Sequence, residues 1–527
     1  MTEGPVIIVG GGLNGLTMAV LLADLDVPTV LVERHTDTSI QYKFAGISPR
    51  SMEIFRGAGL ENEIRAHATG DQQGGTIARG ETLADPHIEI MRNQAWPDAS
   101  PFSPTQRATC DQHVLEPILR RRAESRGAQV RFGTELVSLR QDGEGVRARV
   151  RSRAGREETI DGAYLVAADG AAGATREMLE IDREGPGVLQ HWMNIIFDTD
   201  LRPTLNGERF TSCFVTAVNG TFTPREHGRW LLALQYDPDR GERPEHFDAA
   251  RCRELVTKGA GQPVRAELVD ARPWDAAATV ARRFRKQRCF LLGDTAHLMP
   301  PTGAFGGNSG IHDAHNLAWK LAYVLRGEAD AELLDTYDEE RRPLIEATLE
   351  QALARLRRWF RDLSGKLPPT GEVVPDYDVV LGQRYRAGAL VKDGAADGQA
   401  PFADHAHLAA EPGTRAPHVL VEDDGATRST LDYFGREFVL LCGRESRWPE
   451  VVASAARSTS TVKCVELPAR EGRTGENAWP QRFGVGADGA VLVRPDAFVA
   501  WRSSGWPDAP EARLEGVLRR LRVATRH

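Results

Sequence analysis

Short apolar runs that alternate with helical patterns predict an α/β domain at the start of the chain. Val6 to Val9 is an apolar, β-branched run typical of a buried parallel strand. Apolar residues from Leu16 to Ala23 then recur at helical spacing, and a second β-branched run, Thr29 to Val32, ends at Glu33. A strand, a glycine turn, a helix and a second strand with an acidic end, all within about 30 residues, indicate a dinucleotide-binding unit.

Two later apolar runs repeat the combination of a buried strand and a glycine turn. Tyr164 to Ala168 predicts one strand, and Asp169-Gly170 follows it directly. Cys289 to Leu292 predicts another strand, which is followed by Gly293-Asp294, and a helical pattern begins near Ile311. Each glycine-marked turn is a weak or moderate indication alone, but together they are informative.

Between these runs the pattern of apolar and polar positions changes to alternation and becomes rich in aromatic residues. Trp192 to Phe197 and Arg229 to Tyr236 are two such segments. Alternation predicts strands of an antiparallel sheet that buries one face. The α/β pattern is therefore interrupted by segments of another character, at about residues 70–104 and 184–279.

A third region follows a stretch rich in proline and glycine near residues 394–417, which predicts a domain boundary. Beyond it, Phe438 to Cys442 and Ala490 to Val493 predict strands. Leu514 to Leu521 has the pattern of an amphipathic helix. The last part of the chain is therefore expected to fold separately.

Composition narrows the class of protein. At roughly 100–200 residues per domain, the 527 residues allow two to four domains. The 41% hydrophobic and 27% charged residues are close to globular averages, which argues against a disordered or membrane protein. A net charge of −8 offers no electrostatic footprint for nucleic acid. Since the sequence shows neither a signal peptide nor an apolar stretch of membrane-spanning length, we expect a cytoplasmic protein without a membrane partner.

The six cysteines are scattered along the chain, and none forms a Cys-x-x-Cys pair. The sequence therefore suggests neither a zinc site nor a redox dithiol, and we expect no metal. Buried or idle thiols of a cytosolic protein are the ordinary interpretation.

The first glycine turn has the spacing Gly-x-Gly-x-x-Gly, formed by Gly10, Gly12 and Gly15. The first glycine permits a tight turn, the second lets a pyrophosphate approach the backbone, and the third lets the helix pack on the strand. The helix N-terminus offers N–H groups and its positive dipole end to phosphates, and Glu33 can accept hydrogen bonds from a ribose. The motif predicts a dinucleotide but leaves FAD and NAD both open.

The second and third glycine turns resemble those of one enzyme family. The segment Tyr164 to Gly170, with Arg176 downstream, and the segment Gly293 to Leu321 carry the resemblance. They are similar to the flavin-binding segments of the class A FAD-dependent aromatic hydroxylases, which share the p-hydroxybenzoate hydroxylase fold. The resemblance extends over essentially the whole chain, and its nearest type is the aromatic polyketide hydroxylases such as aklavinone hydroxylase.

The resemblance implies an α/β fold in three parts: a Rossmann-like FAD-binding domain, an inserted antiparallel-sheet substrate domain and a C-terminal thioredoxin-like domain. The FAD-binding domain is expected to comprise residues 1–75, 105–183 and 280–395, the substrate domain 76–104 and 184–279, and the C-terminal domain 396–527. Because the last domain lacks a Cys-x-x-Cys, we expect it to be structural or to support a dimer.

The resemblance also implies which residues bind FAD. Lys43 stands where relatives usually carry an arginine, and Gly173 stands where they commonly carry a serine. Glu116 and His297 are expected to be structural. The implied FAD-binding residues are Gly10, Gly12, Gly15, Glu33, Arg34, Lys43, Arg50, Gln112, Asp169, Asp294, Pro301, Gly303, Gly306, Gly307 and Asn308.

In this family the antiparallel sheet covers the flavin ring and builds an apolar pocket. The candidate pocket residues are Trp96, Phe102, Trp192, Phe214, Phe222, Tyr236, Pro300 and Phe305, and for each of them core packing is the alternative. Arg384 and Arg386 belong to an Arg-Tyr-Arg segment similar to one in polyketide hydroxylases. One of them could stabilise a substrate phenolate as a catalytic residue, and a solvated basic cluster is the alternative.

The implied activity is that of an NADPH- or NADH-consuming monooxygenase that hydroxylates a phenolic, polycyclic, polyketide-like substrate with molecular oxygen, through a flavin C4a-hydroperoxide. Baeyer–Villiger or epoxidising oxygenases on the same scaffold remain alternatives, as does a non-catalytic flavin-binding protein. The Trp-x-Trp-x-Ile-Pro motif of flavin-dependent halogenases is absent from the sequence. We expect a monomer or a homodimer.

Overall fold

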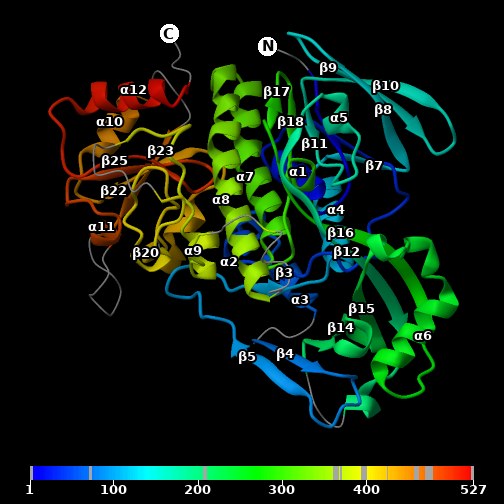
Figure 1. Ribbon diagram of the computed structural model, residues 1–527. Coiled ribbons are helices and arrows are strands. Elements are labelled where there is room, and N and C mark those ends of the chain that lie inside the picture. The colour runs from blue at the N-terminus through cyan, green and yellow to red at the C-terminus, as the bar shows by residue number, and fades with distance from the viewer. Residues whose placement is uncertain are drawn as a thin grey trace.

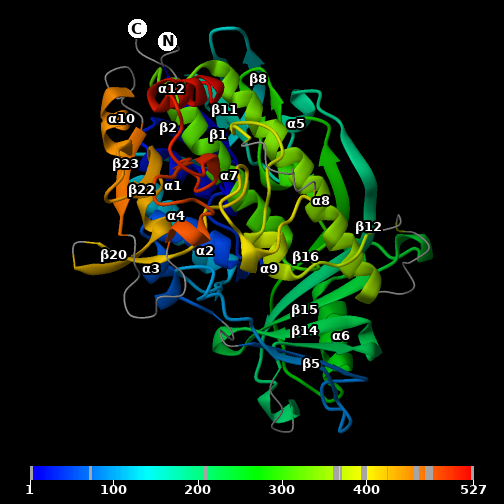
Figure 2. The same ribbon diagram turned by 90° about the vertical axis from the view of Figure 1, so that its left-hand side faces the viewer.

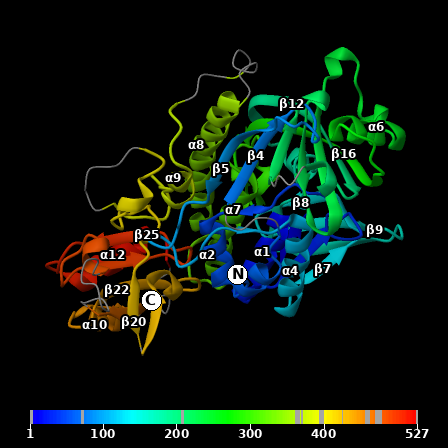
Figure 3. The same cartoon turned by 90° about the horizontal axis from the view of Figure 1, so that it is seen from below.

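The computed structural model describes residues 4–69, 74–205, 210–359, 367, 371–392, 400–423, 425–455, 462–468 and 479–523. Three sheet-based parts are arranged in a row, with the parallel sheet and its helices in the middle (Figures 1 and 3). The inserted antiparallel sheet lies on one side of it and the C-terminal sheet on the other.

The central part is built on a six-stranded sheet whose strand order is β17-β18-β11-β1-β2-β7. The neighbouring strands from β18 to β7 all pair in parallel. The strands are β1 (Val6–Val9), β2 (Thr29–Glu33), β7 (Gln129–Phe132), β11 (Tyr164–Ala167), β17 (Arg285–Lys286) and β18 (Cys289–Leu291). Because β1, β11 and β18 lie side by side, the three glycine-marked turns after them meet at one edge of the sheet, where such sheets bind ligands.

Helices α1 (Leu13–Asp24), α4 (Gln112–Ser125) and α7 (Phe305–Leu325) pack together beside this sheet. The helical pattern near Ile311 belongs to α7, which begins six residues earlier than the sequence suggested. Glycines disfavour a helix, but here two of them are required by close contacts. A Cβ at Gly307 would lie 2.5 Å from the ring of Phe44, and one at Gly310 would lie 2.2 Å from the Asn14 amide.

Smaller strands and helices complete the central part. The two-stranded pair and the three-stranded antiparallel sheet comprise β3 (Gly46–Ile47), β6 (Ala108–Thr109), β8 (Thr134–Gln141), β9 (Val146–Ser152) and β10 (Glu157–Gly162). The remaining helices are α2 (Pro49–Gly57), α3 (Glu61–Ala66), α5 (Thr175–Met178), α8 (Thr336–Trp359) and α9 (Asp376–Leu381). Figure 2 shows α8 running alongside α7 toward the inserted sheet. Ser48 caps α2 by accepting a hydrogen bond from the Ser51 N–H, and proline at the first helical position favours this start.

The inserted part is an eight-stranded sheet with the order β19-β16-β12-β15-β14-β13-β4-β5. Its strands are β4 (Gly74–Gly80), β5 (Glu89–Ala95), β12 (Arg183–Asp198), β13 (Ser212–Val215), β14 (Gly220–Pro224), β15 (Arg229–Tyr236), β16 (Glu267–Ala281) and β19 (His297–Leu298). The pairing of β19 with β16 joins this sheet to the turn that follows β18. The pair of β13 with β4 is parallel, whereas β12 and β15, which contain the two alternating segments, pair antiparallel as predicted.

Alternation assigns each side chain of this sheet to one of two faces. Met193, Ile195 and Phe197 point to the face covered by α6 (Ala249–Ala260) and form a core with its apolar residues, Leu255 among them. We call this the outer face. The intervening positions point the other way, and Ile196 packs there with Tyr42 and Leu231. This inner face is turned toward the central part, because Tyr42 belongs to the segment after β2.

The C-terminal part is a four-stranded sheet with the order β23-β22-β24-β25, in which only β22 and β23 pair in parallel. Its elements are β20 (Leu420–Asp423), β21 (Ala426–Ser429), β22 (Phe438–Gly443), α10 (Trp448–Ala455), β23 (Val462–Leu467), α11 (Trp479–Arg482), β24 (Ala490–Val493), β25 (Val499–Ser503) and α12 (Pro510–Arg520). The parallel pairing of β22 and β23 brings together two cysteines that lie 22 residues apart in the sequence. The sulfur atoms of Cys442 and Cys464 lie 3.6 Å apart.

A cluster of buried charges joins the C-terminal part to the central helices. Arg494 and Lys320 both contact the carboxylate of Glu340, at 2.7 and 2.9 Å, and all three side chains are fully buried. Arg415 and Arg50 both contact the carboxylate of Glu53. We call these residues, together with Asp496, the interdomain charge network. Since buried charges are tolerated only when paired, the network fixes how the parts meet.

Among the helices in the described ranges, none has both the length and the apolar character that crossing a bilayer requires.

Candidate functional site

The glycine turn after β1 leaves space at the N-terminus of α1. Gly10 has a φ of +111°, and a Cβ there would lie 2.2 Å from the carbonyl oxygen of Ala168. A Cβ at Gly15 would lie 2.0 Å from the Gly10 carbonyl oxygen, so both positions require glycine for packing alone. Gly12 differs, because a Cβ there would approach only Glu116 Oε1, at 3.6 Å. The space beside Gly12 is thus left open at a helix N-terminus, where a phosphate binds favourably.

The acidic end of β2 lies beside this turn. Glu33 Oε2 accepts a hydrogen bond of 2.6 Å from the Gly11 N–H, and Oε1 accepts one of 2.8 Å from the His35 N–H. The carboxylate is therefore held next to the glycine turn, as ribose binding requires. Arg34 follows it and is exposed to solvent.

The side chain of Asn14 lies where the first and third motifs meet. Its amide is so close to Gly293 and Gly310 that a Cβ at either glycine would lie about 2.1 or 2.2 Å away. Asn14 Oδ1 is buried and accepts no hydrogen bond from the described residues. A buried acceptor without a donor is costly unless a ligand supplies the donor. The hydroxyl groups of a ribityl chain are suitable donors for this oxygen.

Asp294 lies at the same edge of the sheet and has free acceptor capacity. Its side chain is accessible to solvent, and no donor among the described residues forms a hydrogen bond with its carboxylate. Surrounding protein atoms nevertheless raise the pKa of this carboxyl by desolvation, while the nearby charge of Lys43 acts in the opposite direction. The structure thus places Lys43 and Asp294 close to each other.

The second motif is tied to the third through hydroxyl groups. Asp169 Oδ2 accepts hydrogen bonds from Thr175 N and Oγ1, at 3.0 and 2.7 Å. Thr295 Oγ1 donates to Asp169 Oδ1 at 3.2 Å and accepts from the Gly170 N–H at 2.9 Å. A Cβ at Gly173 would lie 2.2 Å from the Asp169 carboxyl carbon, so a serine there does not fit this backbone. The sequence shows that the serine is missing. The two threonines provide the hydroxyl contacts to Asp169 instead, and the sequence motif does not indicate them.

His297 belongs to a buried chain of charges behind the third motif. Its Nε2 lies 2.8 Å from Asp313 Oδ2, and Arg341 Nε donates to Asp313 Oδ1 at 2.7 Å. Burial alone would raise the pKa of Asp313, but the charges of Arg341 and His297 lower it to about 2. These contacts agree with the structural role expected for His297.

Gln112 and Glu116 connect α4 to the glycine turn. Gln112 Nε2 donates to Glu116 Oε1 at 2.6 Å, and Glu116 Oε2 accepts from the Ser39 N–H at 2.9 Å. Burial raises the pKa of the Glu116 carboxyl. Gln112 is therefore positioned beside the space at Gly12, and Glu116 holds the segment after β2 in place.

The segment from Pro300 to Asn308 forms the entrance to α7. Ala304 is in the left-handed region with a φ of 55° and precedes the first turn of the helix. Both ends of the Asn308 amide form hydrogen bonds. Its Nδ2 donates to the carbonyl oxygens of Gly46 and Ala304. Its Oδ1 accepts from the Ser48 N–H and the Ser51 hydroxyl. Pro301 and Gly303 are exposed, whereas a Cβ at Gly306 would contact only Met299, at 4.0 Å. A Cβ at Gly303 would lie 2.4 Å from the Phe305 ring, so the open positions are Pro301 and Gly306, and Asn308 holds the α7 N-terminus to α2.

Arg50 lies away from the glycine turn. Its guanidinium donates to Glu53 at 2.9 Å and to the carbonyl oxygen of Asp496 at 2.7 Å. The side chain is buried in the interdomain charge network, and this placement does not support the predicted contact with FAD. The sequence could not show this, because Asp496 lies 446 residues further along the chain.

The candidate pocket residues divide between the two faces of the inserted sheet. Trp192 and Phe214 are on the inner face, since their neighbours Met193 and Cys213 belong to the outer core. Phe222 and Tyr236 lie in that outer core themselves. This placement does not support their predicted pocket role, because alternation shows that a strand has two faces but not which face is turned to the ligand.

The other pocket candidates lie near the entrance to α7. Phe305 packs with residues of α9, and Phe102 packs against the same cluster. Trp96 stacks on the Arg107 guanidinium, 3.6 Å from its ring centre. Pro300 is buried.

Arg384 and Arg386 lie at the boundary with the C-terminal part. Arg384 donates to Glu411 Oε2 at 2.6 Å, so its charge is already paired. Between the two arginines, Tyr385 is buried and stacks on Phe498 at 4.2 Å. Arg386 is exposed. The pairing of Arg384 argues against a free cation for a phenolate.

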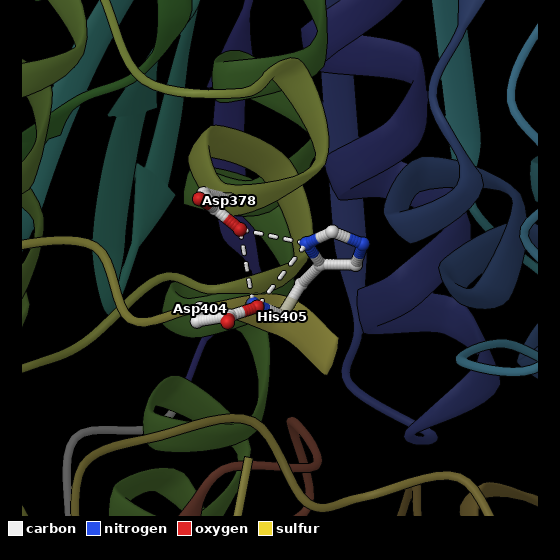
Figure 4. Close-up of side chains that lie close together, drawn as sticks. All are labelled: Asp378, Asp404 and His405. Atoms are coloured by element: carbon white, nitrogen blue, oxygen red, sulfur yellow. Dashed lines mark hydrogen bonds and ion pairs between the residues drawn. The ribbon is translucent and has the colours of Figure 1, made fainter. Parts of the chain in front are cut away.

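Asp378, Asp404 and His405 place three potential metal ligands within 4.8 Å of one another. Figure 4 shows the His405 Nδ1 edge turned toward Asp378. Asp378 Oδ1 accepts from His405 Nδ1 at 2.6 Å and from the His405 N–H at 3.0 Å. These hydrogen bonds link α9 to the segment after residue 400, which explains why the three side chains lie together.

Two family models match the chain. A family model described as an FAD binding domain matches residues 3–352. A second model, described as the C-terminal region of aromatic-ring hydroxylases, matches residues 409–522.

Two curated relatives match along their full lengths. Tetracenomycin B2 monooxygenase-dioxygenase of Streptomyces olivaceus is 37% identical, over 99% of this chain and 99% of the relative. The 4-methyl-5-nitrocatechol 5-monooxygenase of a Burkholderia species is 37% identical, over 98% of this chain and 97% of the relative.

Among solved structures, aklavinone-11 hydroxylase in complex with FAD and aklavinone superposes with a TM-score of 0.88. It is 37% identical, and the match covers 99% of each chain. The predicted fold class and the predicted FAD cofactor are confirmed by these findings.

Proposed function

Because the chain belongs to the FAD-dependent aromatic-ring hydroxylases, we propose that it is an NAD(P)H-consuming monooxygenase that hydroxylates a phenolic, polycyclic aromatic substrate of the polyketide kind. The observation that carries the substrate class is the full-length match, in sequence and in fold, to enzymes named for tetracenomycin and aklavinone. The aromatic side chains on the inner face are consistent with a flat substrate.

The residues at the sheet edge fit FAD. The open position at Gly12 would admit the pyrophosphate to the N–H groups of α1, and Glu33 lies where it can bind the ribose. Asn14 and Asp294 offer unused acceptors for ribityl hydroxyls. Bound there, FAD would accept a hydride from NAD(P)H and supply the chemistry that activates oxygen.

The chain's own part in the reaction is to bind, orient and exclude water. The inserted sheet covers the edge of the central sheet where the three glycine turns meet, and its inner face is apolar and aromatic in its middle. Excluding water protects a reactive oxygen species from decomposition, and holding the ring close to the oxidant raises the rate. The N-terminus of α7 places a positive helix end near the predicted flavin ring, where it would stabilise the reduced, anionic form.

A product assay tests this function. The purified holoenzyme is incubated with NADPH or NADH and with a panel of hydroxylated anthraquinones and angucycline-like phenols, and products are analysed by mass spectrometry. We expect a gain of one oxygen atom in a polycyclic phenol. A protein that oxidises NAD(P)H without any oxygenated product across the panel, or one that oxygenates only small catechols, would contradict the proposed substrate class. A lactone or an epoxide as product would favour the Baeyer–Villiger or epoxidising alternatives.

We further propose that the protein acts in the cytoplasm, as a monomer or a homodimer. The cytoplasm supplies NAD(P)H and keeps thiols reduced, and all six cysteines are free. Light scattering of the purified protein would distinguish the two oligomeric states.

A further inference from the structure

The inner face of the inserted sheet carries two neighbouring N–H donors that have no acceptor. Trp192 on β12 lies directly opposite Gln235 on β15. Trp192 is 7% exposed, and its indole Nε1 is buried without a hydrogen-bond partner among the described residues. The amide Nε2 of Gln235 is also buried and is likewise without a partner there. Buried donors of this kind are rare in folded proteins and usually have a ligand or a specific role.

Neighbouring contacts hold both donors in place. The Trp192 ring stacks on Trp274 of β16 with centroids 5.6 Å apart and an interplanar angle of 13°. The indole N–H of Trp274 is itself satisfied by Asn194 Oδ1 at 2.8 Å, which fixes the ring plane. Asn219 Nδ2 donates to Gln235 Oε1 at 3.4 Å, so the amide nitrogen of Gln235 is the end left without a partner. The two indoles therefore form a stacked apolar pair, with the unpaired Trp192 N–H and the Gln235 amide beside it.

The stacked pair lies between two places where the sheet contacts the central part. On one side the inner face is supported by Tyr42, which packs with Ile196 and Leu231. On the other side β16 pairs with β19 at Thr279 and Leu298, within the third glycine motif. Trp274 lies five residues before Thr279, which is about 16 Å along the strand. The indole pair is thus located between two supports that join the sheet to the central part.

We infer that Trp192 Nε1 and Gln235 Nε2 donate hydrogen bonds to a carbonyl oxygen of the substrate, while Trp192 and Trp274 contact its ring system. The inference rests on the proposed function and specifies it further: the substrate carries an acceptor oxygen on the ring that faces the sheet. Two N–H donors favour an acceptor oxygen on the substrate. An amine there would place its own N–H groups against these donors. An aromatic pair beside these donors favours an aromatic ring system through ring–ring and apolar contacts.

The test compares two ligands with two variants of the oxidised holoenzyme. Trp192→Phe keeps an aromatic ring and removes the N–H, and Gln235→Met keeps the length of the side chain and removes the amide. The ligands are a hydroxyanthraquinone and the hydroxyanthracene with the same hydroxyl position but no carbonyl. Their Kd values are measured from the change in flavin absorbance on titration.

A hydrogen bond to a neutral or charged oxygen is worth a factor of about 3 to 30 in affinity. We therefore expect each variant to weaken binding of the quinone by roughly tenfold and to change binding of the hydroxyanthracene by less than about twofold. Equal losses for both ligands, or no loss for the quinone, would overturn the inference. Tyr236→Phe is the matched control, because Tyr236 lies next to Gln235 on the same strand but in the outer core.

The binding assay separates this inference from the proposed function. If the wild-type protein binds the quinone more tightly through these donors but forms no hydroxylated product from any phenol, the proposed function fails and the donor pair stands. If products form and the variants bind both ligands like the wild type, the donor pair fails and the function stands. Unchanged flavin content and unfolding temperature of the variants show that they are folded.

Discussion

Two buried polar regions lie on opposite sides of the central sheet, and they differ in how their groups are paired. In the interdomain charge network, Glu340 receives hydrogen bonds from Arg494, Lys320 and Asn316. On the inner face of the inserted sheet, Trp192 Nε1 and Gln235 Nε2 have no acceptor among the described residues. In the network, the groups named here are paired within the protein. On the inner face, the two donors need an acceptor from another molecule.

The difference shows how the pairing of buried polar groups distinguishes an interface between domains from a binding site. A buried charge that is fully paired contributes to a defined arrangement of parts, since removing one partner leaves the other uncompensated. A buried donor without an acceptor lowers the stability of the free protein and becomes favourable when a ligand supplies the acceptor. We therefore assign the network to stability and the inner face to recognition.

The largest expected effect comes from removing the central carboxylate of the network. Glu340→Gln would leave Lys320 and Arg494 buried without their counter-charge, and we expect it to lower the free energy of unfolding by about 3–5 kcal/mol. Chemical denaturation measures this. In the matched control Glu346→Gln, the altered side chain pairs with Arg342 on the same helix and is 50% exposed. A surface pair of this kind contributes below about 1 kcal/mol. Equal losses for the two variants would mean that the network does not stabilise the interface between domains.

Acid tests Glu340 of the network, together with the buried Asp313 behind the third motif, without a mutation. The pKa of the buried Asp313 is lowered from 3.8 to about 2, and that of the buried Glu340 from 4.5 to about 2, because neighbouring cations outweigh desolvation. A lowered folded-state pKa stabilises the protein above the unfolded-state pKa, and this stability is lost as the pH falls toward 2. For Asp313 the shift corresponds to about 2 kcal/mol.

We therefore expect the unfolding temperature to fall steeply between roughly pH 4.5 and 2. The indole and amide donors of the inner face do not titrate in this range, so they contribute nothing to the fall. A Glu340→Gln variant should show a shallower decline than the wild type, measured by thermal unfolding across pH. The same slope in both proteins would contradict the assignment of Glu340.

A smaller effect is expected at the glycine turn, where the structure leaves space for a ligand. Gly12→Ala adds a methyl group that would approach the protein only at Glu116 Oε1, 3.6 Å away. We expect FAD affinity to fall by roughly tenfold or more with little change in the stability of the apoprotein. Flavin fluorescence titration and thermal unfolding measure the two quantities. Gly15→Ala is the contrasting variant and should impair folding, because its Cβ would lie 2.0 Å from the Gly10 carbonyl oxygen.

The smallest expected effect is at Arg384. Since it is paired with Glu411 at the boundary with the C-terminal part, it resembles the network rather than the inner face. Arg384→Gln should therefore change kcat by less than about threefold, which is below 1 kcal/mol in barrier height. A much larger loss of kcat, with KM and flavin content unchanged, would restore it as a catalytic residue.

The local motifs could be predicted from the sequence because each is encoded within a few residues. Gly15 requires a missing side chain because a Cβ there would lie 2.0 Å from the carbonyl oxygen of Gly10, five residues earlier in the same motif. Glu33 is the last residue of its strand, and the structure places it beside the glycine turn as expected. The segment Gly293 to Leu321 likewise indicates the family through a local pattern of residues.

Contacts between distant segments could not be predicted. Arg50 carries the same local signature whether it faces a cofactor or Asp496, and only folding brought Asp496 next to it. Thr175 and Thr295 replaced an expected serine because the backbone at Gly173 lies against the Asp169 carboxyl group. No spacing rule in the sequence indicates that Arg50 contacts Asp496 or that threonines provide the hydroxyl contacts expected of a serine.

The sequence by itself determined that this protein has a dinucleotide turn, a flavin segment and an alternating sheet, because these depend on backbone conformation and periodicity. The tertiary structure decided which face of that sheet is turned toward the flavin region. Trp192 and Phe222 satisfy the same alternating, aromatic pattern, yet one lies on the inner face and the other in the outer core. A period of two distinguishes the faces of a strand but carries no information about what packs on each.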